Sequence, residues 1–259
     1  MAVKDKVVII TGGAMGIGRY NAREFAAAGA RLAIVDIAPM EDVASEVAEL
    51  GAQVLPVHTD LRDEEQVKAA MAQVHKHYGR IDVLINDAGI VTHFMSGSPR
   101  WPAIRDMDSS FFDNIIRTNL IGTFHATKSV IPFMVAQGGG HIINFGQGNV
   151  RNDREPDSIG ACVYHVSKVA IRAFTKEVAA EEREHNICIV SMGPGGGDAQ
   201  PNDGLRGIAT DETPAENRAR MRWVGDVVKD RYILAAEAPM ELTGNQITAR
   251  DGKLVKLDD

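Results

Sequence analysis

Residues 11–18 read Thr11-Gly-Gly-Ala-Met-Gly-Ile-Gly18, directly after an apolar run at 7–10 and before a segment with helical character. The glycines at 12, 16 and 18 permit a sharp turn and let a ligand approach the backbone, because glycine has no Cβ atom. A helix that begins here directs its free N–H groups and the positive end of its dipole at the turn. This order of strand, glycine-rich turn and helix predicts a pyrophosphate-binding site, although a strand-to-helix turn can need glycine for its own geometry.

A second apolar run, at 31–35, ends in Asp36, which lies 18 residues after the last glycine of the loop. In dinucleotide-binding folds, an acidic residue about 20 residues after the loop binds the adenosine ribose. A carboxylate there accepts hydrogen bonds from both ribose hydroxyls and repels a 2′-phosphate. The neighbouring Met15 and Ile37 bring no positive charge. The pattern therefore predicts NAD(H) as cofactor rather than NADP(H).

Strand and helix patterns alternate along all 259 residues. Several strand candidates are nearly continuous apolar runs, which is typical of parallel sheets that are covered on both faces. We predict an α/β fold in one domain over residues 1–259, a three-layer doubly wound parallel sheet (Rossmann fold) with ligands at the carboxyl ends of its strands. Strands are expected at 6–11, 31–36, 53–58, 82–86, 140–145, 187–192 and, more weakly, 246–249. Helices are expected at 17–28, 40–50, 63–78, 110–136, 160–184 and 225–236. The less regular segments, at about 92–108, 147–158 and 193–224, are expected to form the substrate loops.

The composition excludes several classes of function. The net charge of −7 argues against binding to nucleic acid. No apolar run approaches the roughly 18 residues of a membrane span, and the first four residues lack the features of a signal peptide. The two cysteines form neither a disulfide framework nor a metal-ligand pair, and no other spacing indicates a metal site. We therefore expect a cytoplasmic protein with a small-molecule substrate, without a metal ion and without a membrane partner.

Further motifs, in order along the chain, resemble those of the short-chain dehydrogenase/reductase family in its compact single-domain form. The matching segments are Thr11–Gly18, Asp60-Leu61, Asn86-Asp-Ala-Gly89, Asn119-Leu-Ile-Gly122, Tyr164-His-Val-Ser-Lys168, Pro194-Gly195 and Leu242-Thr-Gly-Asn-Gln246. Asp87 replaces the second Asn of the family's NNAG motif. Together with the loop, the resemblance implies cofactor contacts from Gly12, Met15, Gly16, Ile17, Gly18, Asp36, Asp60, Leu61, Asn86, Ala88, Gly89, Tyr164, Lys168, Pro194 and Gly195. The family's acidic residue that matches Asp60 contacts adenine. It also implies a homotetramer or a dimer, in which the long helices at 110–136 and 160–184 pair between subunits.

Tyr164 and Lys168 are four residues apart, so a helix places them on one face. An ammonium group near a phenol is expected to lower the phenol pKa from its usual value of about 10. Such a phenol can take a proton from an alcohol while a hydride moves to NAD, or return it in the reverse reaction. In the family the lysine also holds the nicotinamide ribose, and the residue that matches Asn119 anchors a water molecule in a proton relay. The predicted activity is the interconversion of a secondary alcohol and a ketone.

The family's usual substrate-binding serine falls on Gln147 in this sequence, and the segment from there to Tyr164 is longer than is usual in the family. Three explanations stay open. The Gln147 amide can donate the hydrogen bond in place of the serine, or Ser158 can supply it from the inserted segment. Alternatively, the oxidoreductase step is impaired. In that case the chain is an NAD-using enzyme of another reaction class (elimination, epimerisation or dehalogenation) or a nucleotide-binding protein without turnover.

Overall fold

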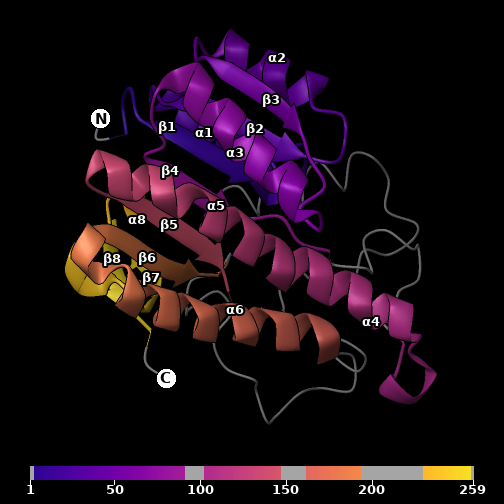
Figure 1. The fold of residues 1–259 in the computed structure, drawn as a ribbon. Helices are drawn as coiled ribbons and strands as arrows, with labels where there is room; N and C mark the ends of the chain where they lie inside the picture. Colours follow the sequence, from indigo (N-terminus) through magenta and orange to yellow (C-terminus); the bar gives the residue numbers. More distant parts are fainter. Residues whose placement is uncertain (1–2, 91–101, 147–161, 194–229, 258–259) are drawn as a thin grey trace.

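The computed structural model describes residues 3–90, 102–146, 162–193 and 230–257. Their strands form one sheet in the order β3-β2-β1-β4-β5-β6-β7-β8, with helices on both faces (Figure 1). The strands are β1 (Val7–Thr11), β2 (Arg31–Asp36), β3 (Val54–His58), β4 (Val83–Asn86), β5 (Gly140–Phe145), β6 (Ile187–Met192), β7 (Gln246–Arg250) and β8 (Lys253–Lys256). All neighbours from β3 to β7 are parallel, which confirms the predicted doubly wound fold.

The last strand, β8, was not expected from the sequence. It pairs with β7 in the antiparallel direction. Asp251 and Gly252, the two residues between these strands, both have positive φ angles, of 49° and 71°. Positive φ at both central residues is typical of the two-residue hairpin turn that an Asp-Gly pair favours. The hairpin therefore adds an antiparallel edge to a sheet that is otherwise parallel.

Alternate residues of the strands enter two separate cores, because successive side chains of a strand point to opposite faces. One core lies under α1 (Gly16–Ala27), α2 (Glu41–Glu49) and α8 (Arg231–Ala235), and contains Ile10 and Ile34. The other lies under α3 (Glu64–Tyr78), α5 (Gly122–Gln137) and α6 (Cys162–Glu181), and contains Ile9 and Val35. The sheet is thus the middle of three layers.

The segment expected as one helix at 110–136 has a more detailed structure. It consists of α4 (Ser109–Ile116), a π-helical turn, η3 (Arg117–Ile121), and α5. A π turn inserts an extra residue into the helical ladder and is found most often at functional sites. Asn119 lies within this turn and is fully buried.

Short 3-10 turns complete the described structure: η2 (Ile104–Asp106), η5 (Arg183–His185) and η6 (Met240–Leu242). A helix was expected at 225–236. The structure describes this segment from residue 230 onward, and there α8 covers Arg231–Ala235. None of the helices in the described parts of the chain is long and apolar enough to cross a membrane.

Candidate active site

The glycine-rich loop lies at the point where the strand order reverses. β1 neighbours β2 on one side and β4 on the other, and this is where open α/β sheets bind their ligands. Thr11 at the end of β1 is in register with Asn86 at the end of β4. The Thr11 hydroxyl donates to the Ile85 carbonyl oxygen and accepts from the Ala88 N–H, each at 3.3 Å. The residues that follow β4 are thereby held against the loop.

The glycines of the loop serve different purposes. Gly12 has a φ of +72°, and a Cβ atom on it would lie 2.6 Å from Cα of Ala88. A Cβ atom on Gly18 would collide with the carbonyl oxygen of Gly12. Gly16 has a φ of +59°, and a Cβ atom there would meet nothing within 4 Å. Gly12 and Gly18 are therefore required by packing, whereas Gly16 leaves an open approach to the backbone.

The N-terminus of α1 is suited to an anion. Met15 precedes the helix without a side-chain capping bond, and the first turn contains no acidic residue. The first N–H groups of a helix have no partner within the helix and combine with the positive end of the dipole. Met15 is 63% exposed beside this turn. The loop therefore fits the pyrophosphate of a dinucleotide.

Asp36, at the end of β2, lies at the outer side of the loop. Its two carboxylate oxygens accept hydrogen bonds from the N–H groups of Ala14 and Ala38, both at 2.9 Å. An ionised carboxylate has about four acceptor positions, so two remain for other donors. Ile37, which follows it, is 54% exposed. A carboxylate held in this way fits the predicted contact with the two ribose hydroxyls.

Asp60 already has partners within the protein. Its carboxylate pairs with Arg62 at 2.6 Å, and the hydrogen bonds from the Arg62 side chain lower the pKa of Asp60. The Asp60 N–H donates to Gln66. Leu61 is buried, and its carbonyl oxygen lies 2.9 Å from Nδ1 of His125. Contact of Asp60 with adenine, and of Leu61 with the cofactor, stays a prediction.

The Asn86 side chain points into the protein. Its amide donates to Asn144 Oδ1 at 2.8 Å and to Thr127 Oγ1 at 3.1 Å. Asn144, one strand further along the sheet, donates in turn to Thr175 of α6 at 2.9 Å. This buried polar network joins the ends of β4 and β5 to α5 and α6. Sequence reasoning missed Asn144 and the two threonines of this network, and the local signal for Asn144 was a polar residue near the end of an apolar strand.

Tyr164, Lys168 and Asn119 come together at this edge of the sheet. Nδ2 of Asn119 lies 3.1 Å from Oγ of Ser167, which donates to the Tyr164 carbonyl oxygen at 2.7 Å. Nζ of Lys168 lies 5.5 Å from the centre of the Tyr164 ring. It donates to the Phe145 carbonyl oxygen at the end of β5 at 2.9 Å. The predicted shared face of Tyr164 and Lys168 is confirmed, and Ser167 is a further member of the group.

The residues after β4 join this group to the loop. Oδ1 of Asn119 accepts from the Ile90 N–H at 2.7 Å. A Cβ atom on Gly89 would lie 3.4 Å from both Asn119 Oδ1 and Lys168 Nζ. The segment from Ala88 to Ile90 thus runs from the glycine-rich loop to the helices that carry the candidate catalytic side chains.

A family model described as short chain dehydrogenase matches residues 6–206. The chain belongs to the short-chain dehydrogenase/reductase family. It is 31% identical to an oxidoreductase of Bacillus subtilis over 261 residues, which cover 96% of this chain and 91% of that protein. It is 30% identical over 263 residues to the 3-oxoacyl-(acyl-carrier-protein) reductase FabG of Thermotoga maritima, with 98% and 100% covered. Among solved structures, that of an NAD⁺-bound xylitol dehydrogenase superposes with a TM-score of 0.67 at 27% identity, covering 75% of this chain and 72% of that one.

In this short-chain dehydrogenase/reductase the pKa of Tyr164 differs from the sequence-based expectation. Burial raises the pKa of Tyr164, and the negative charge of Asp87 raises it further. Burial also lowers the pKa of Lys168 to about 8, against an opposite effect of Asp87. The expected lowering of the phenol pKa was therefore wrong for the protein's own groups, because burial and the negative charge of Asp87 both raise it.

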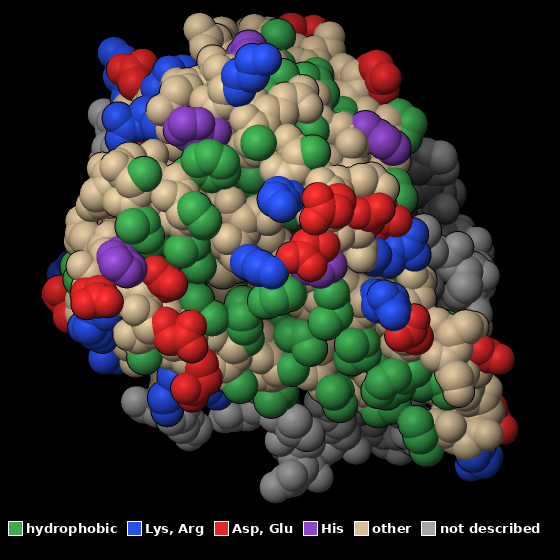
Figure 2. All heavy atoms as spheres, in the orientation of Figure 1, with side chains coloured by type: hydrophobic (Ala, Val, Ile, Leu, Met, Phe, Trp, Pro, Cys, Tyr) green, Lys and Arg blue, Asp and Glu red, His purple; other side chains and the backbone are tan. Residues whose placement is uncertain are grey.

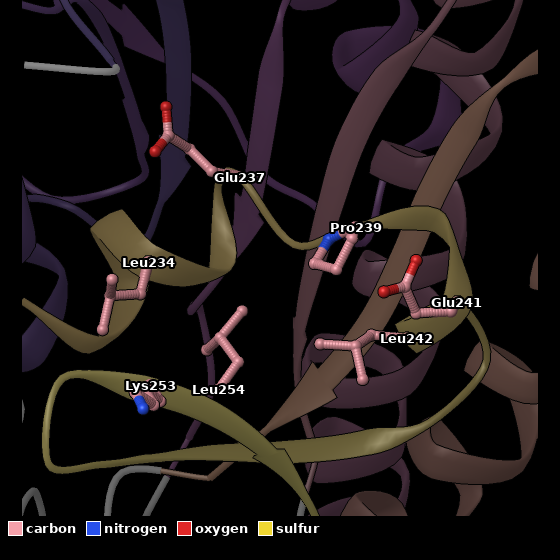
Figure 3. Close-up of a pocket in the computed structure, with 7 residues that line it drawn as sticks. All are labelled: Leu234, Glu237, Pro239, Glu241, Leu242, Lys253 and Leu254. Carbon is pink, nitrogen blue, oxygen red and sulfur yellow. The ribbon is translucent and has the colours of Figure 1, made fainter.

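Several predicted residues lie outside the described parts of this short-chain dehydrogenase/reductase. They are Gln147, Pro194, Gly195, the segment 147–158 and most of 92–108 and 193–224. The described residues contain no group of three His, Cys, Asp or Glu side chains that could hold a metal ion. A surface cavity of about 400 Å³ lies between α8, η6 and β8, lined by residues such as Leu234, Leu242 and Leu254 (Figure 3). Among the residues that the structure describes, none of the candidate catalytic side chains lines this cavity, which places it apart from Tyr164, Lys168 and Asn119.

Proposed function

We propose that the protein is an NAD-dependent oxidoreductase that interconverts a secondary alcohol and a ketone by hydride transfer. The observation that carries the proposal is the meeting of Tyr164, Lys168 and Asn119 beside the glycine-rich loop. These groups come from η3 and α6. Asn119 is held by its bonds to Ser167 and Ile90, and Lys168 by its separate bond to the Phe145 carbonyl oxygen. Their placement at the reversal point of the strand order brings proton-transfer chemistry next to a dinucleotide-binding loop.

The preference for NAD rests on Asp36. Its carboxylate is held at the loop by two backbone N–H groups, and a 2′-phosphate at the ribose would meet its negative charge. The 27%-identical xylitol dehydrogenase was solved with NAD⁺ bound, which supports a nicotinamide cofactor for this chain as well. Gly16 and the N-terminus of α1 would hold the pyrophosphate.

Bound NAD⁺ supplies the hydride acceptor, and its positive ring favours the phenolate form of a nearby tyrosine. Tyr164 takes the alcohol proton in oxidation and returns it in reduction. Lys168, anchored on Phe145, would hold the nicotinamide ribose. Asn119 would anchor the water molecule of a proton relay and keeps the residues after β4 in place. Gln147 would donate a hydrogen bond to the substrate oxygen, in the role that serine has in the family.

The apolar side chains on the helical face support assembly with a second copy. Phe112 of α4, Phe124 of α5 and Val166 and Val169 of α6 are between 37% and 52% exposed, and hydrophobic side chains gather on this face in Figure 2. Groups of exposed apolar residues commonly mark interfaces. We propose a homodimer or homotetramer that uses this face. Sedimentation of the wild type and of Val166→Asp is expected to show dissociation of the variant, and equal sedimentation would contradict the assignment.

The function is tested by following NADH absorbance while a panel of secondary alcohols and ketones is offered to the protein. Turnover is expected with NADH formed or consumed in step with product, and Tyr164→Phe should lower kcat by about 10²–10⁴-fold while NAD affinity stays within about twofold. Product formation without a net change in NADH would favour an elimination, epimerisation or dehalogenation. NAD binding without any turnover, unaffected by Tyr164→Phe, would identify a nucleotide-binding protein.

A further inference from the structure

Asp87 lies between the glycine-rich loop and the candidate catalytic group. On one side its neighbour Ala88 packs against Gly12, where a Cβ atom would be 2.6 Å away. On the other side Gly89 packs against α6, where a Cβ atom would be 3.4 Å from Lys168 Nζ. The protonation of a side chain at position 87 therefore depends on the charge of Lys168 and on the charge of any ligand bound at the loop.

The carboxyl group of Asp87 is poorly accommodated as an anion. Its Oδ1 atom is shielded from solvent and has no hydrogen-bond partner among the described residues. A buried carboxylate oxygen without a partner costs free energy, and protonation removes most of that cost. The family motif that this segment resembles has a neutral amide at this position. The aspartate thus adds an ionisable group where the motif needs none.

Several charged or titratable groups face Asp87 from the elements packed around it in the described structure. Lys168 of α6 and the Gly18 N–H of α1 favour the carboxylate, whereas burial and Asp36 of β2 oppose it. Burial is the largest of these effects, and the pKa of Asp87 is raised to about 7. Tyr164 of α6 and Tyr232 of α8 are neutral near this pH, because the pKa of each is raised by burial and by Asp87.

We propose that Asp87 is a proton-binding residue of the cofactor site, which takes up a proton when the pyrophosphate of a dinucleotide binds to the glycine-rich loop. This rests on the proposed function, because it takes NAD(H) as the ligand. Two phosphate charges brought to the loop add to the charge of Asp36 and raise the free energy of the Asp87 carboxylate. The proton comes from solvent and returns there when the dinucleotide leaves. By linkage, dinucleotide binding and protonation of Asp87 strengthen each other.

The test is a titration of the aspartate carboxyl carbons by ¹³C NMR between pH 5 and 9, with and without a saturating concentration of NAD in its reduced form, whose nicotinamide ring has no positive charge. The resonance of Asp87 is assigned by its absence in Asp87→Asn, or in Asp87→Ser if the first variant does not fold. In the free protein this resonance is expected to titrate near pH 7, and with NAD its midpoint should rise by about 1 pH unit. Asp5, which is exposed and precedes β1 at the opposite end of the sheet from the loop, provides an internal control whose resonance should not move on NAD binding.

The outcomes separate the two proposals. An Asp87 resonance that titrates below pH 5 in the free protein, or whose midpoint does not rise in the NAD complex, overturns the proton-uptake inference and leaves the proposed function standing. Absence of NAD binding, measured by calorimetry on the same samples, overturns both. A rise of the Asp87 midpoint while the Asp5 resonance stays unchanged supports the inference. The readout is the protonation of one carboxyl group and does not depend on turnover.

Discussion

Nδ2 of Asn119 lies 3.1 Å from Oγ of Ser167, and this hydrogen bond joins the π turn η3 to α6. On its other side Asn119 accepts from the N–H of Ile90 at 2.7 Å. A single buried amide thus connects the helix of the candidate acid/base residue to the segment that follows β4. The π turn is the local distortion that contains this amide.

Replacing Asn119 by alanine is expected to affect both stability and turnover. The variant leaves the Ile90 N–H without its partner, which should lower the free energy of unfolding by about 1–3 kcal/mol. Misplacement of the residues after β4 should lower kcat by about 10²-fold. Ser167→Ala is the matched control, because it removes the bond to Asn119 Nδ2 and keeps the bond to Ile90. Urea unfolding and steady-state kinetics would contradict this role if the two variants were equally active.

The glycines of the loop provide a pair of variants with opposite expectations. Gly12→Ala places a Cβ atom 2.6 Å from Ala88 at a positive φ, so the free protein should lose about 2–5 kcal/mol of stability. Gly16→Ala has the strained φ but open space, so its loss should be near 1–2 kcal/mol, whereas NAD binding should weaken at least tenfold. Thermal unfolding and NAD titration measure the two effects. Tight NAD binding by Gly16→Ala would show that the pyrophosphate lies elsewhere.

Asp36→Asn is expected to change cofactor choice. Loss of the negative charge removes the repulsion of a 2′-phosphate, so the ratio of kcat/KM with NADP to kcat/KM with NAD should rise about tenfold or more. The variant also weakens one charge-assisted bond to the loop, which should cost about 1–2 kcal/mol of stability. Asp60→Asn is the control, because the predicted partner of Asp60 is adenine, which both cofactors share. An unchanged ratio in Asp36→Asn would place the ribose away from β2.

The lowered pKa of Lys168 makes stability depend on pH. The lysine is 2% exposed, and burial lowers its pKa from the ordinary value of 10.5 to about 8 on folding. Between these two values the unfolded chain binds a proton that the folded protein does not, so this residue's contribution makes stability rise with pH from about 8 to 10.5. Below that window the buried charge is costly.

Lys168→Met is therefore expected to stabilise the free protein near pH 7 by up to about 3 kcal/mol, less about 1 kcal/mol for the lost bond to Phe145. The gain should vanish near pH 10, where the lysine is neutral in the folded state. Lys168→Arg, which keeps a charge at all these pH values, is the control and should show no such convergence. Denaturant unfolding at pH 7 and pH 10 tests this, and a stability difference independent of pH would contradict it.

The sequence by itself determined the order of strands and helices up to β7, apart from the π turn η3, together with the glycine-rich turn, the placement of Asp36 and the shared face of Tyr164 and Lys168. Each of these depends on local geometry: residue periodicity, backbone freedom at glycine, or a four-residue spacing on a helix. Only the tertiary structure decided that Asn86 points to Asn144, 58 residues away, and that Asn119 meets Ser167. It also decided the raised pKa of Tyr164, because desolvation depends on all the atoms packed around a group and not on its neighbours along the chain.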